Sequence, residues 1–363
     1  MPPGYGYGNA RLRAMRSHLL TAADYSALLA KASIEELITA LAETPYQKDI
    51  EVALVRMEGV RCVFEAVRAN LTRTLRQIRG FFEGEPLTLV DLLLRRWDRH
   101  NLLTILRGHS QEISPELVLS SIVPVGWQLD EVALRELVHQ PGLRAAIDLM
   151  TTWRLPYARV LRQAQARADP ISGLDQLELA LNRSHYASLW AALKPGNGNG
   201  AIMLEHLQTE VDLVNISTTL RLARMPGVTA LVAQRYHATD VRPLLIEARG
   251  HLSTQQLANI VAEGKGVEGV VLELSHTRYG QALEAGWRRY QGGEDSLAVL
   301  ERELERWQAN QTMAMFSRNP LSIAIPIGYI GCKELEAANL RLIAQAVHLD
   351  MKREQVRRDL IIA

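Results

Sequence analysis

The sequence predicts an all-α protein, and three observations support this. Apolar residues recur at helical spacing in most windows, whereas alternation of apolar and polar residues is not sustained long enough to build a sheet. Expected helix starts carry capping residues, as where Ser33 is followed three positions later by Glu36. The best strand candidate, 267–274, reads equally well as a helix.

Composition indicates a folded protein with no global charge bias. The 363 residues are enough for two or three domains, and 47% hydrophobic with 22% charged residues is ordinary for a globular chain. A net charge of +1 supplies no overall field toward nucleic acid or an anionic membrane, so no nucleic-acid partner is expected.

Membrane insertion and secretion are not expected either. The first residues carry arginines without the apolar core of a secretory signal. The longest apolar stretch, 322–331, is far below the roughly 20 residues needed to span a bilayer. The chain is therefore expected to be soluble and intracellular.

In chain order, we expect helices over 87–108, 210–224 and 300–316. The stretches 28–46, 136–157 and 256–279 are each expected to hold an amphipathic helix, a short break and a second helix. Another start is expected at Ser114, where Pro115 would take the first helical position. The stretch 194–200, KPGNGNG, is expected to be a flexible surface turn. Near the end, Pro326, Gly328 and Gly331 interrupt an apolar run, and the last helix is expected after them.

One constellation is written three times: an acid, two residues, an asparagine and then aliphatic residues. On a helix, positions i and i+3 share a face, so each acid should lie beside its asparagine. Asparagine is otherwise uncommon inside a helix, so its recurrence needs an explanation. The pairs are Asp98 with Asn101, Asp212 with Asn215, and Glu336 with Asn339.

A tyrosine precedes each pair. Tyr46, Tyr157 and Tyr279 each follow two short helices and threonine, and they lie 55, 58 and 60 positions before the corresponding asparagine. Such regular spacing predicts three related helical modules. We expect them at 1–120, 121–235 and 236–363, with residues 9–15 as a partial fourth copy of the asparagine helix.

These markers favour an architectural role over catalysis. A buried asparagine can fix the packing of a neighbouring element, and a tyrosine can bury its ring while its hydroxyl is hydrogen-bonded. A catalytic site usually needs its residues assembled once, whereas this constellation occurs three times.

The sequence contains no clear catalytic, cofactor-binding or metal-binding motif. GKGVEG at 264–269 matches GxGxxG but follows an amphipathic helix instead of a strand, so a helix–helix turn is expected there. No Walker A, HExxH or GxSxG pattern occurs, and the two cysteines have no metal-ligand spacing.

Arginines recur along 61–79 and 95–107 and have two interpretations. They can cover a packed bundle while paired with acids, which is the more common situation, or they can form a docking face for an acidic partner.

Three stretches together resemble a known family: YGNARLRAMRSHLLTAADYSALLAKASIEELITALAETPY at 7–46, DRHNLLTILRG at 98–108 and PIGYIGCKELEAANLRLIA at 326–344. They resemble the C subunit of V-type and A-type ATPases (ATP synthases), which corresponds to the d subunit of the vacuolar enzyme. The middle of the chain is similar in the order of its modules.

The resemblance implies three similar helical domains around a pseudo-threefold axis, forming a funnel without catalytic activity. It also implies partners: the membrane rotor ring below and the central shaft of the soluble ATPase head above. The protein would be peripheral, on the cytoplasmic side of the membrane. On this hypothesis, some of Arg11, Arg13, Arg95 and Arg96 line a partner-facing surface.

Two other functions stay open from the sequence. The first is a helical-repeat scaffold outside the ATPase that binds a peptide or helix. The second is an all-α enzyme whose site is assembled without a local motif.

Overall fold

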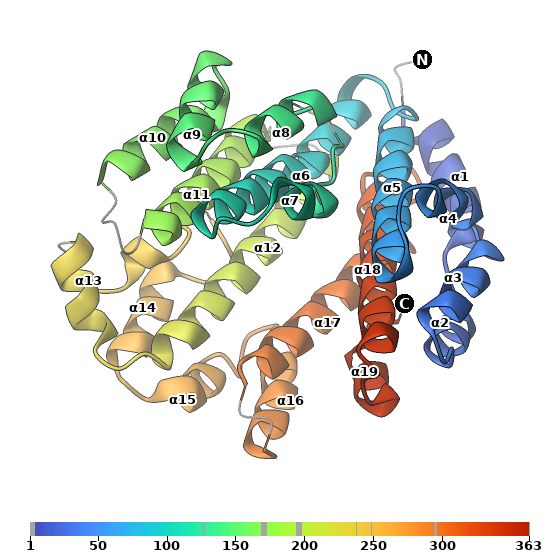
Figure 1. Ribbon diagram of the computed structural model, residues 1–363. Helices are drawn as coiled ribbons and strands as arrows, with labels where there is room; N and C mark the ends of the chain where they lie inside the picture. Colours follow the sequence, from blue (N-terminus) through green and yellow to red (C-terminus); the bar gives the residue numbers. More distant parts are fainter. Residues whose placement is uncertain are drawn as a thin grey trace. The chain divides into compact units, whose positions relative to one another are not determined.

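The computed structural model describes residues 4–125, 128–167, 173–193, 198–236, 238–247, 249–293 and 296–362. Within these ranges every regular element is helical, which confirms the all-α prediction (Figure 1). The helices are α1 (Gly6–Met15), α2 (Ala22–Leu29), α3 (Ile34–Ala42), α4 (Gln47–Leu54), α5 (Gly59–Arg79), α6 (Gly84–Ser110), α7 (Pro115–Ser121), α8 (Glu131–Val138), α9 (Leu143–Thr152), α10 (Pro156–Arg167), α11 (Gly173–Ala192), α12 (Gly198–Ala223), α13 (Val228–Tyr236), α14 (Thr254–Ala262), α15 (Gly266–Glu273), α16 (Gly280–Gln291), α17 (Ala298–Met315), α18 (Ala324–His348) and α19 (Arg353–Asp359).

The chain forms two compact units. The first joins residues 1–181 to 312–363, so both ends of the chain belong to it, and the second comprises residues 182–311. The predicted boundaries at 120 and 235 are a different division, based on sequence repeats, and they remain a prediction.

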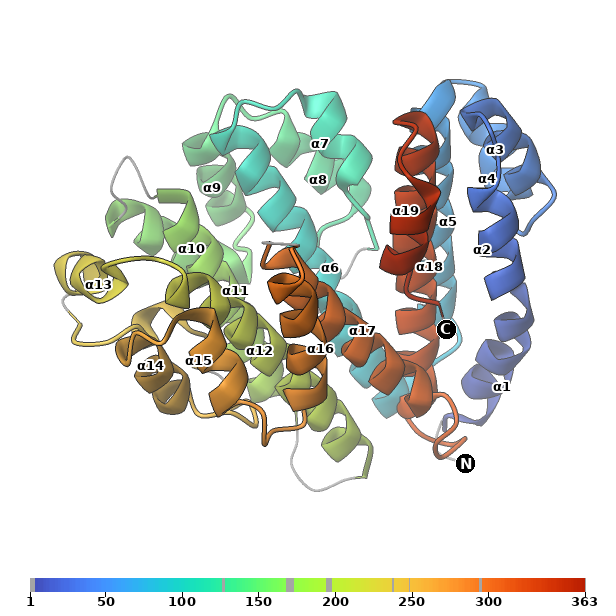
Figure 2. The same ribbon diagram turned by 90° about the horizontal axis from the view of Figure 1, so that it is seen from below.

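In the first unit, α18 packs along α5, and α1, α2 and α3 pack against α18 (Figures 1 and 2). Helix α4 joins this group by packing on α5 and α3. A separate apolar core of the same unit lies among α6, α7, α8, α9 and α10, with Leu102, Leu137 and Ile147 fully buried in it. The second half of α6 is therefore anchored by its apolar face.

In the second unit, α12 packs against α14 and α15, and α15 packs against α16. An apolar core of this unit includes Ile216, Leu257 and Leu283, which are completely buried. The expected strand candidate at 267–274 is occupied by α15. Positive φ angles at Gly264 and Gly266 form the turn from α14 to α15, which confirms the helix–helix turn expected at GKGVEG.

The expected break before the last helix is wrong. Helix α18 begins at Ala324 and runs through Pro326, Gly328 and Gly331. A proline in the first helical turn removes an amide that has no partner inside the helix, so it is tolerated there. The glycines serve close packing, since a Cβ on Gly328 would lie 2.9 Å from the backbone nitrogen of Phe316.

Two further local expectations need correction. Residues 194–197 of the expected turn lie outside the described residues, but 198–200 already belong to α12. At Ser33 the hydroxyl accepts the amide of Glu36 as expected, whereas the Glu36 carboxylate accepts the amide of Ala32 instead of the Ser33 amide.

Candidate functional site

The three asparagines make the same pair of hydrogen bonds. Each amide group donates to the carbonyl, and accepts from the amide, of one residue in an extended segment further along the chain. All three asparagines are at most 1% exposed. The nitrogen-to-oxygen distances are 2.8 and 2.9 Å for Asn101 with Val123, 3.0 and 2.8 Å for Asn215 with Ile246, and 2.7 and 3.3 Å for Asn339 with Ile361.

The asparagine side chain thus gives one residue of each extended segment the pair of hydrogen bonds that a neighbouring β-strand would otherwise provide. A buried peptide group without a partner is costly, and these segments lie against helices that offer no free backbone groups. Each asparagine therefore docks an extended segment onto its helix. We call each helical acid–asparagine pair with its backbone partners a hub.

In the second hub the acid has three donors. The amides of His251 and Leu252 donate to the two Asp212 oxygens at 3.0 and 3.1 Å, and the Tyr279 hydroxyl donates at 2.7 Å. Burial raises the pKa of Asp212, and the hydrogen bonds from Tyr279 and the two amides oppose that shift. Gly250 permits the close approach, since a Cβ there would lie 2.1 Å from Asp212 Oδ1.

The third hub is completed by the opposite end of the chain. Glu336 accepts the amide of Leu20 at 2.6 Å and the hydroxyl of Tyr46 at 2.7 Å. Its neighbour Asn339 holds Ile361, so residues from both ends meet on adjacent turns of α18. The N-terminal and C-terminal segments are therefore fastened to one helix.

The acid of the first hub has fewer donors among the residues that the structure describes. Backbone amides of Gln128 and Leu129 hydrogen-bond to Asp98, but within those described residues its Oδ2 atom has no hydrogen-bond partner, although Asp98 is only 2% exposed. Burial raises the pKa of Asp98 to about 7, against the opposing effect of those amides and of Arg95. Tyr157 lies near this carboxylate, and burial together with the Asp98 charge raises the pKa of its phenol to about 12.

Each of the three tyrosines lies beside a hub acid other than the next one in the sequence. Tyr157 lies near Asp98, and the Tyr279 hydroxyl donates to Asp212, so in both cases the tyrosine lies beside the hub acid that precedes it in the sequence. No hub acid precedes Tyr46 in the sequence, and its hydroxyl binds the last hub acid, Glu336. The order of connections is therefore cyclic, although the chain is linear.

Two of the tyrosines are positioned by the same turn. The Thr44 hydroxyl donates to the Leu41 carbonyl and accepts the Tyr46 amide, and Thr277 does the same with Leu274 and Tyr279. The hydroxyl-to-carbonyl distances are 2.6 Å in both turns, and the amide-to-hydroxyl distances are 3.2 Å. These two hydrogen bonds of the threonine hydroxyl explain why a Thr–x–Tyr motif occurs at both 44–46 and 277–279.

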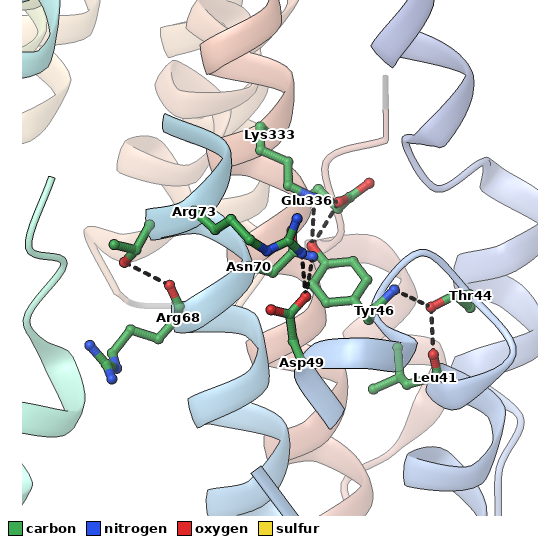
Figure 3. A network of polar contacts seen from close by, with 10 residues as sticks. Leu41, Thr44, Tyr46, Asp49, Arg68, Asn70, Arg73, Lys333 and Glu336 are labelled. Carbon is green, nitrogen blue, oxygen red and sulfur yellow. Dashed lines mark hydrogen bonds and ion pairs between the residues drawn. The ribbon is translucent and has the colours of Figure 1, made fainter. Parts of the chain in front are cut away.

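A larger polar network surrounds the third hub (Figure 3). Lys333, on α18, is 4% exposed, donates to Glu336 at 2.5 Å and to the Tyr46 hydroxyl at 3.1 Å, and lies 4.5 Å from the centroid of the Tyr46 ring. Burial lowers the pKa of Lys333, and the charge and hydrogen bond of Glu336 oppose this.

The network continues onto α5. Asp49, at the start of α4, accepts Asn70 at 2.7 Å and Arg73 at 2.6 Å. Sequence reasoning did not find Asp49, Asn70 or Lys333, whereas Arg73 belongs to the arginine series noted along 61–79. The i, i+3 spacing of Lys333 and Glu336 was the available sign, but such pairs are also common on helix surfaces.

The extended segments that carry Val123, Ile246 and Ile361 were missed as well. These segments share no sequence motif, and their bonded residues lie 22, 31 and 22 positions after the corresponding asparagines. A hydrogen bond to backbone places no requirement on the partner's side chain, so the sequence leaves no mark there.

The four predicted partner-facing arginines lie in two environments. Arg11 and Arg13 are exposed on α1. Arg95 and Arg96 are half-buried on α6, where Arg96 pairs with Glu334 at 3.1 Å and burial lowers the pKa of Arg95. Among the other arginines, Arg68 and Arg79 on α5 are paired with Glu65 and Asp91, and Arg107 on α6 is paired with Glu178. Many of the arginine side chains on α5 and α6 thus form ion pairs within the protein.

The described residues provide neither a membrane span nor a metal site. Each of their helices is too short or too polar to cross a membrane. They also hold no group of three His, Cys, Asp or Glu side chains arranged to bind a metal ion. The buried polar side chains of the hubs hold backbone and one another.

Comparison with known proteins gives a consistent result over almost the whole chain. The family model of the ATP synthase (C/AC39) subunit matches residues 8–359. The C subunit of the A-type ATP synthase of Methanococcoides burtonii is 27% identical, over 99% of this chain and 94% of its own. Its counterpart in Methanosarcina acetivorans is also 27% identical, over 99% and 93%. The C subunit of the V-type ATP synthase of Deinococcus radiodurans is 23% identical, over 99% and 92%.

Proposed function

The chain belongs to the ATP synthase (C/AC39) subunit family, and from this membership we propose that it is the non-catalytic central-stalk adapter of a rotary A/V-type ATPase. In this role it joins the shaft of the soluble ATPase head to the membrane rotor ring and turns with both. It is peripheral and lies on the cytoplasmic side of the membrane.

The cyclic order of the hubs is the observation that supports this role best. A torque adapter must resist twisting between its two partners, and rigidity requires that elements distant in sequence be fastened together. Each acid–asparagine helix is bonded to the segment that follows it, and the last is also bonded to the first segment of the chain through Leu20 and Tyr46. These hydrogen bonds fasten segments that are distant in the sequence, as a rigid adapter requires.

We propose further that the three repeats, at 1–120, 121–235 and 236–363, are three similar domains around a pseudo-threefold axis, which together form a funnel. The recurrence of the asparagine hydrogen bonds in α6, α12 and α18 supports this. The wide end would receive the shaft, and the narrow end would face the rotor ring.

Among the four candidate arginines, we propose that Arg11 and Arg13 lie on the side of the protein that faces the membrane ring. Both are exposed on α1, whereas Arg95 and Arg96 are half-buried on α6. Charge reversal at both positions, Arg11→Glu with Arg13→Glu, should weaken attachment to native membranes at low salt, because exposed charges act most strongly when screening is low.

The test of the adapter function is a tagged pull-down of the chain from its own cells in mild detergent, with identification of every co-purifying protein. We expect the small membrane ring subunit together with the shaft and ATPase subunits. Recovery of the chain alone, or with unrelated proteins, would contradict the adapter function and favour a helical-repeat scaffold with another partner.

A further inference from the structure

Helix α1 and the turn before α18 form a small exposed surface. Asn9 donates to the carbonyls of Pro320 and Ser322 at 2.8 and 2.9 Å, which fastens α1 beside that turn. On the other flank of α1, the ring of Tyr7 packs edge-on against Phe81. We call this the α1 surface, and its residues are Tyr7, Arg11, Arg13, Arg16, Arg318 and Leu321.

The α1 surface is basic. In the part of the chain that the structure describes, none of its four guanidinium groups forms an ion pair with a carboxylate, in contrast to Arg79 nearby, which pairs with Asp91. Residues 1–23 contain no acid at all. Two exposed carboxylates, Glu83 and Glu85, follow the turn after α5, so the cations remain in excess.

The same surface exposes apolar side chains. Tyr7 is 67% exposed and Leu321 is 62% exposed. Arg11 lies over the Phe81 ring at 5.4 Å and Arg16 over the Phe316 ring at 5.0 Å, so the cations are held close to apolar groups. Unpaired cations interleaved with exposed tyrosine and leucine are typical of surfaces that contact lipid headgroups.

We propose that the α1 surface binds anionic phospholipid headgroups, with the arginines contacting phosphate and Tyr7 and Leu321 entering the interfacial layer. The inference rests on the proposed function for its biological setting, since that function brings one side of the protein near the membrane. The chemistry itself belongs to this chain alone. An acidic protein surface is the competing occupant, and the vesicle experiment below separates the two, because only a lipid-binding surface responds to purified phospholipid.

The experiment is vesicle flotation of the purified full chain. Vesicles of phosphatidylcholine alone are compared with vesicles that also contain phosphatidylglycerol, at low and at high salt. The test variants are Arg11→Gln with Arg13→Gln, and Tyr7→Ser with Leu321→Ser. Matched controls are Arg159→Gln with Arg162→Gln, exposed arginines of α10, and Val132→Ser, an apolar residue of α8 that is 69% exposed.

We expect the wild type to bind the anionic vesicles in a salt-sensitive manner and to leave the neutral ones unbound. Loss of Arg11 and Arg13 should lower the partition coefficient about tenfold or more, since each basic residue near an anionic surface contributes about 1 kcal/mol. The Tyr7 and Leu321 variant should also bind more weakly. The controls should bind like the wild type, and thermal denaturation should show all variants folded.

Several results would overturn the proposal. If the test and control arginine variants lose vesicle binding equally, binding responds to the net charge of the protein alone. If the wild type does not bind the vesicles, lipid is excluded as the occupant. If the wild type ignores vesicles while the Arg11 and Arg13 variant loses the ring in detergent pull-downs, the α1 surface binds an acidic protein instead. The pull-down of the wild type tests the adapter function separately, so either idea can fail alone.

Discussion

At the scale of single residues, the hubs show why a poor helix former is kept inside three helices. Asparagine weakens a helix slightly by its propensity, by well under about 1 kcal/mol. Here it satisfies both the amide and the carbonyl of a buried residue in an extended segment, and each of those groups would cost more if left unpaired. The acid–x–x–asparagine motif therefore recurs because the backbone of each docked segment needs hydrogen-bond partners.

Replacing Asn101 or Asn339 by leucine should destabilise the protein by about 2–5 kcal/mol, because two buried backbone groups lose their partner at each site. Urea denaturation measures this, with the exposed Asn259→Leu as control, for which a change within about 0.5 kcal/mol is expected. Unchanged stability in both hub variants would show that the segments at Val123 and Ile361 are held by other contacts.

The first hub should make stability depend on pH. Because the folded-state pKa of Asp98 is raised to about 7, well above its ordinary value of 3.8, the native state holds this proton more tightly than the unfolded chain. The free energy of unfolding contributed by the tighter binding of this proton is fully present below pH 3.8 and is lost as the pH rises to about 7. The loss is at most about 1.4 kcal/mol per pH unit.

Asp98→Asn should remove that dependence, so its stability relative to the wild type should increase between about pH 4 and 7. Urea midpoints measured across this range for both proteins check it. Asp212→Asn is the matched comparison, and it should lose stability at neutral pH because Tyr279 and two amides donate to that carboxylate. Parallel pH curves for wild type and Asp98→Asn would contradict the assignment.

At the scale of elements, helical periodicity was sufficient to predict helices but not their ends. The stripes at 87–108 and 300–316 lie in α6 and α17, where spacing of apolar residues decides the structure. Pro326, Gly328 and Gly331 read locally as a break, yet tertiary packing made them part of α18. The hub asparagines and acids were visible in the sequence because they recur, whereas their backbone partners carry no side-chain requirement and could not be seen.

Gly328 tests the packing explanation for α18. Gly328→Ala would add a Cβ 2.9 Å from the backbone nitrogen of Phe316 and 3.2 Å from its Cα atom, so the end of α17 would have to move. We expect a loss of about 1–3 kcal/mol, although alanine is the better helix former. Gly198→Ala in α12, where no atom of the described residues lies within 4 Å of the added Cβ, should be neutral or stabilising. A stabilising Gly328→Ala would mean that propensity outweighs this contact.

At the scale of the whole molecule, the two ends of the chain build one structural unit. In the second hub, one continuous segment supplies Ile246 to Asn215 and, five positions later, His251 to Asp212. In the first hub Val123 and Gln128 have the same separation. In the third hub the corresponding partners are Ile361 and Leu20, from opposite ends of the chain. The third hub is thus assembled from segments near both ends of the sequence.

A circular permutant should therefore fold. Residue 363 would be joined to residue 1 by a flexible Gly/Ser linker of roughly 15 residues, which can span the distance from the Asn339 region of α18 to its first turn. New ends between Gly292 and Gly293 interrupt no hub, because these glycines are exposed and lie after α16. We expect a urea midpoint close to that of the wild type and retention of the same partners in a pull-down.

The control permutant carries the same linker but opens between Arg249 and Gly250. That cut divides the segment between Ile246, held by Asn215, and His251, held by Asp212, so the second hub loses the continuity that couples its two halves. It should be clearly less stable than the first permutant, and hydrogen exchange should localise the loss to α12 and α14. Equal stability of the two permutants would show that the hubs do not depend on chain continuity, and failure of the first to fold would show that the ends of this chain do not form a repeat.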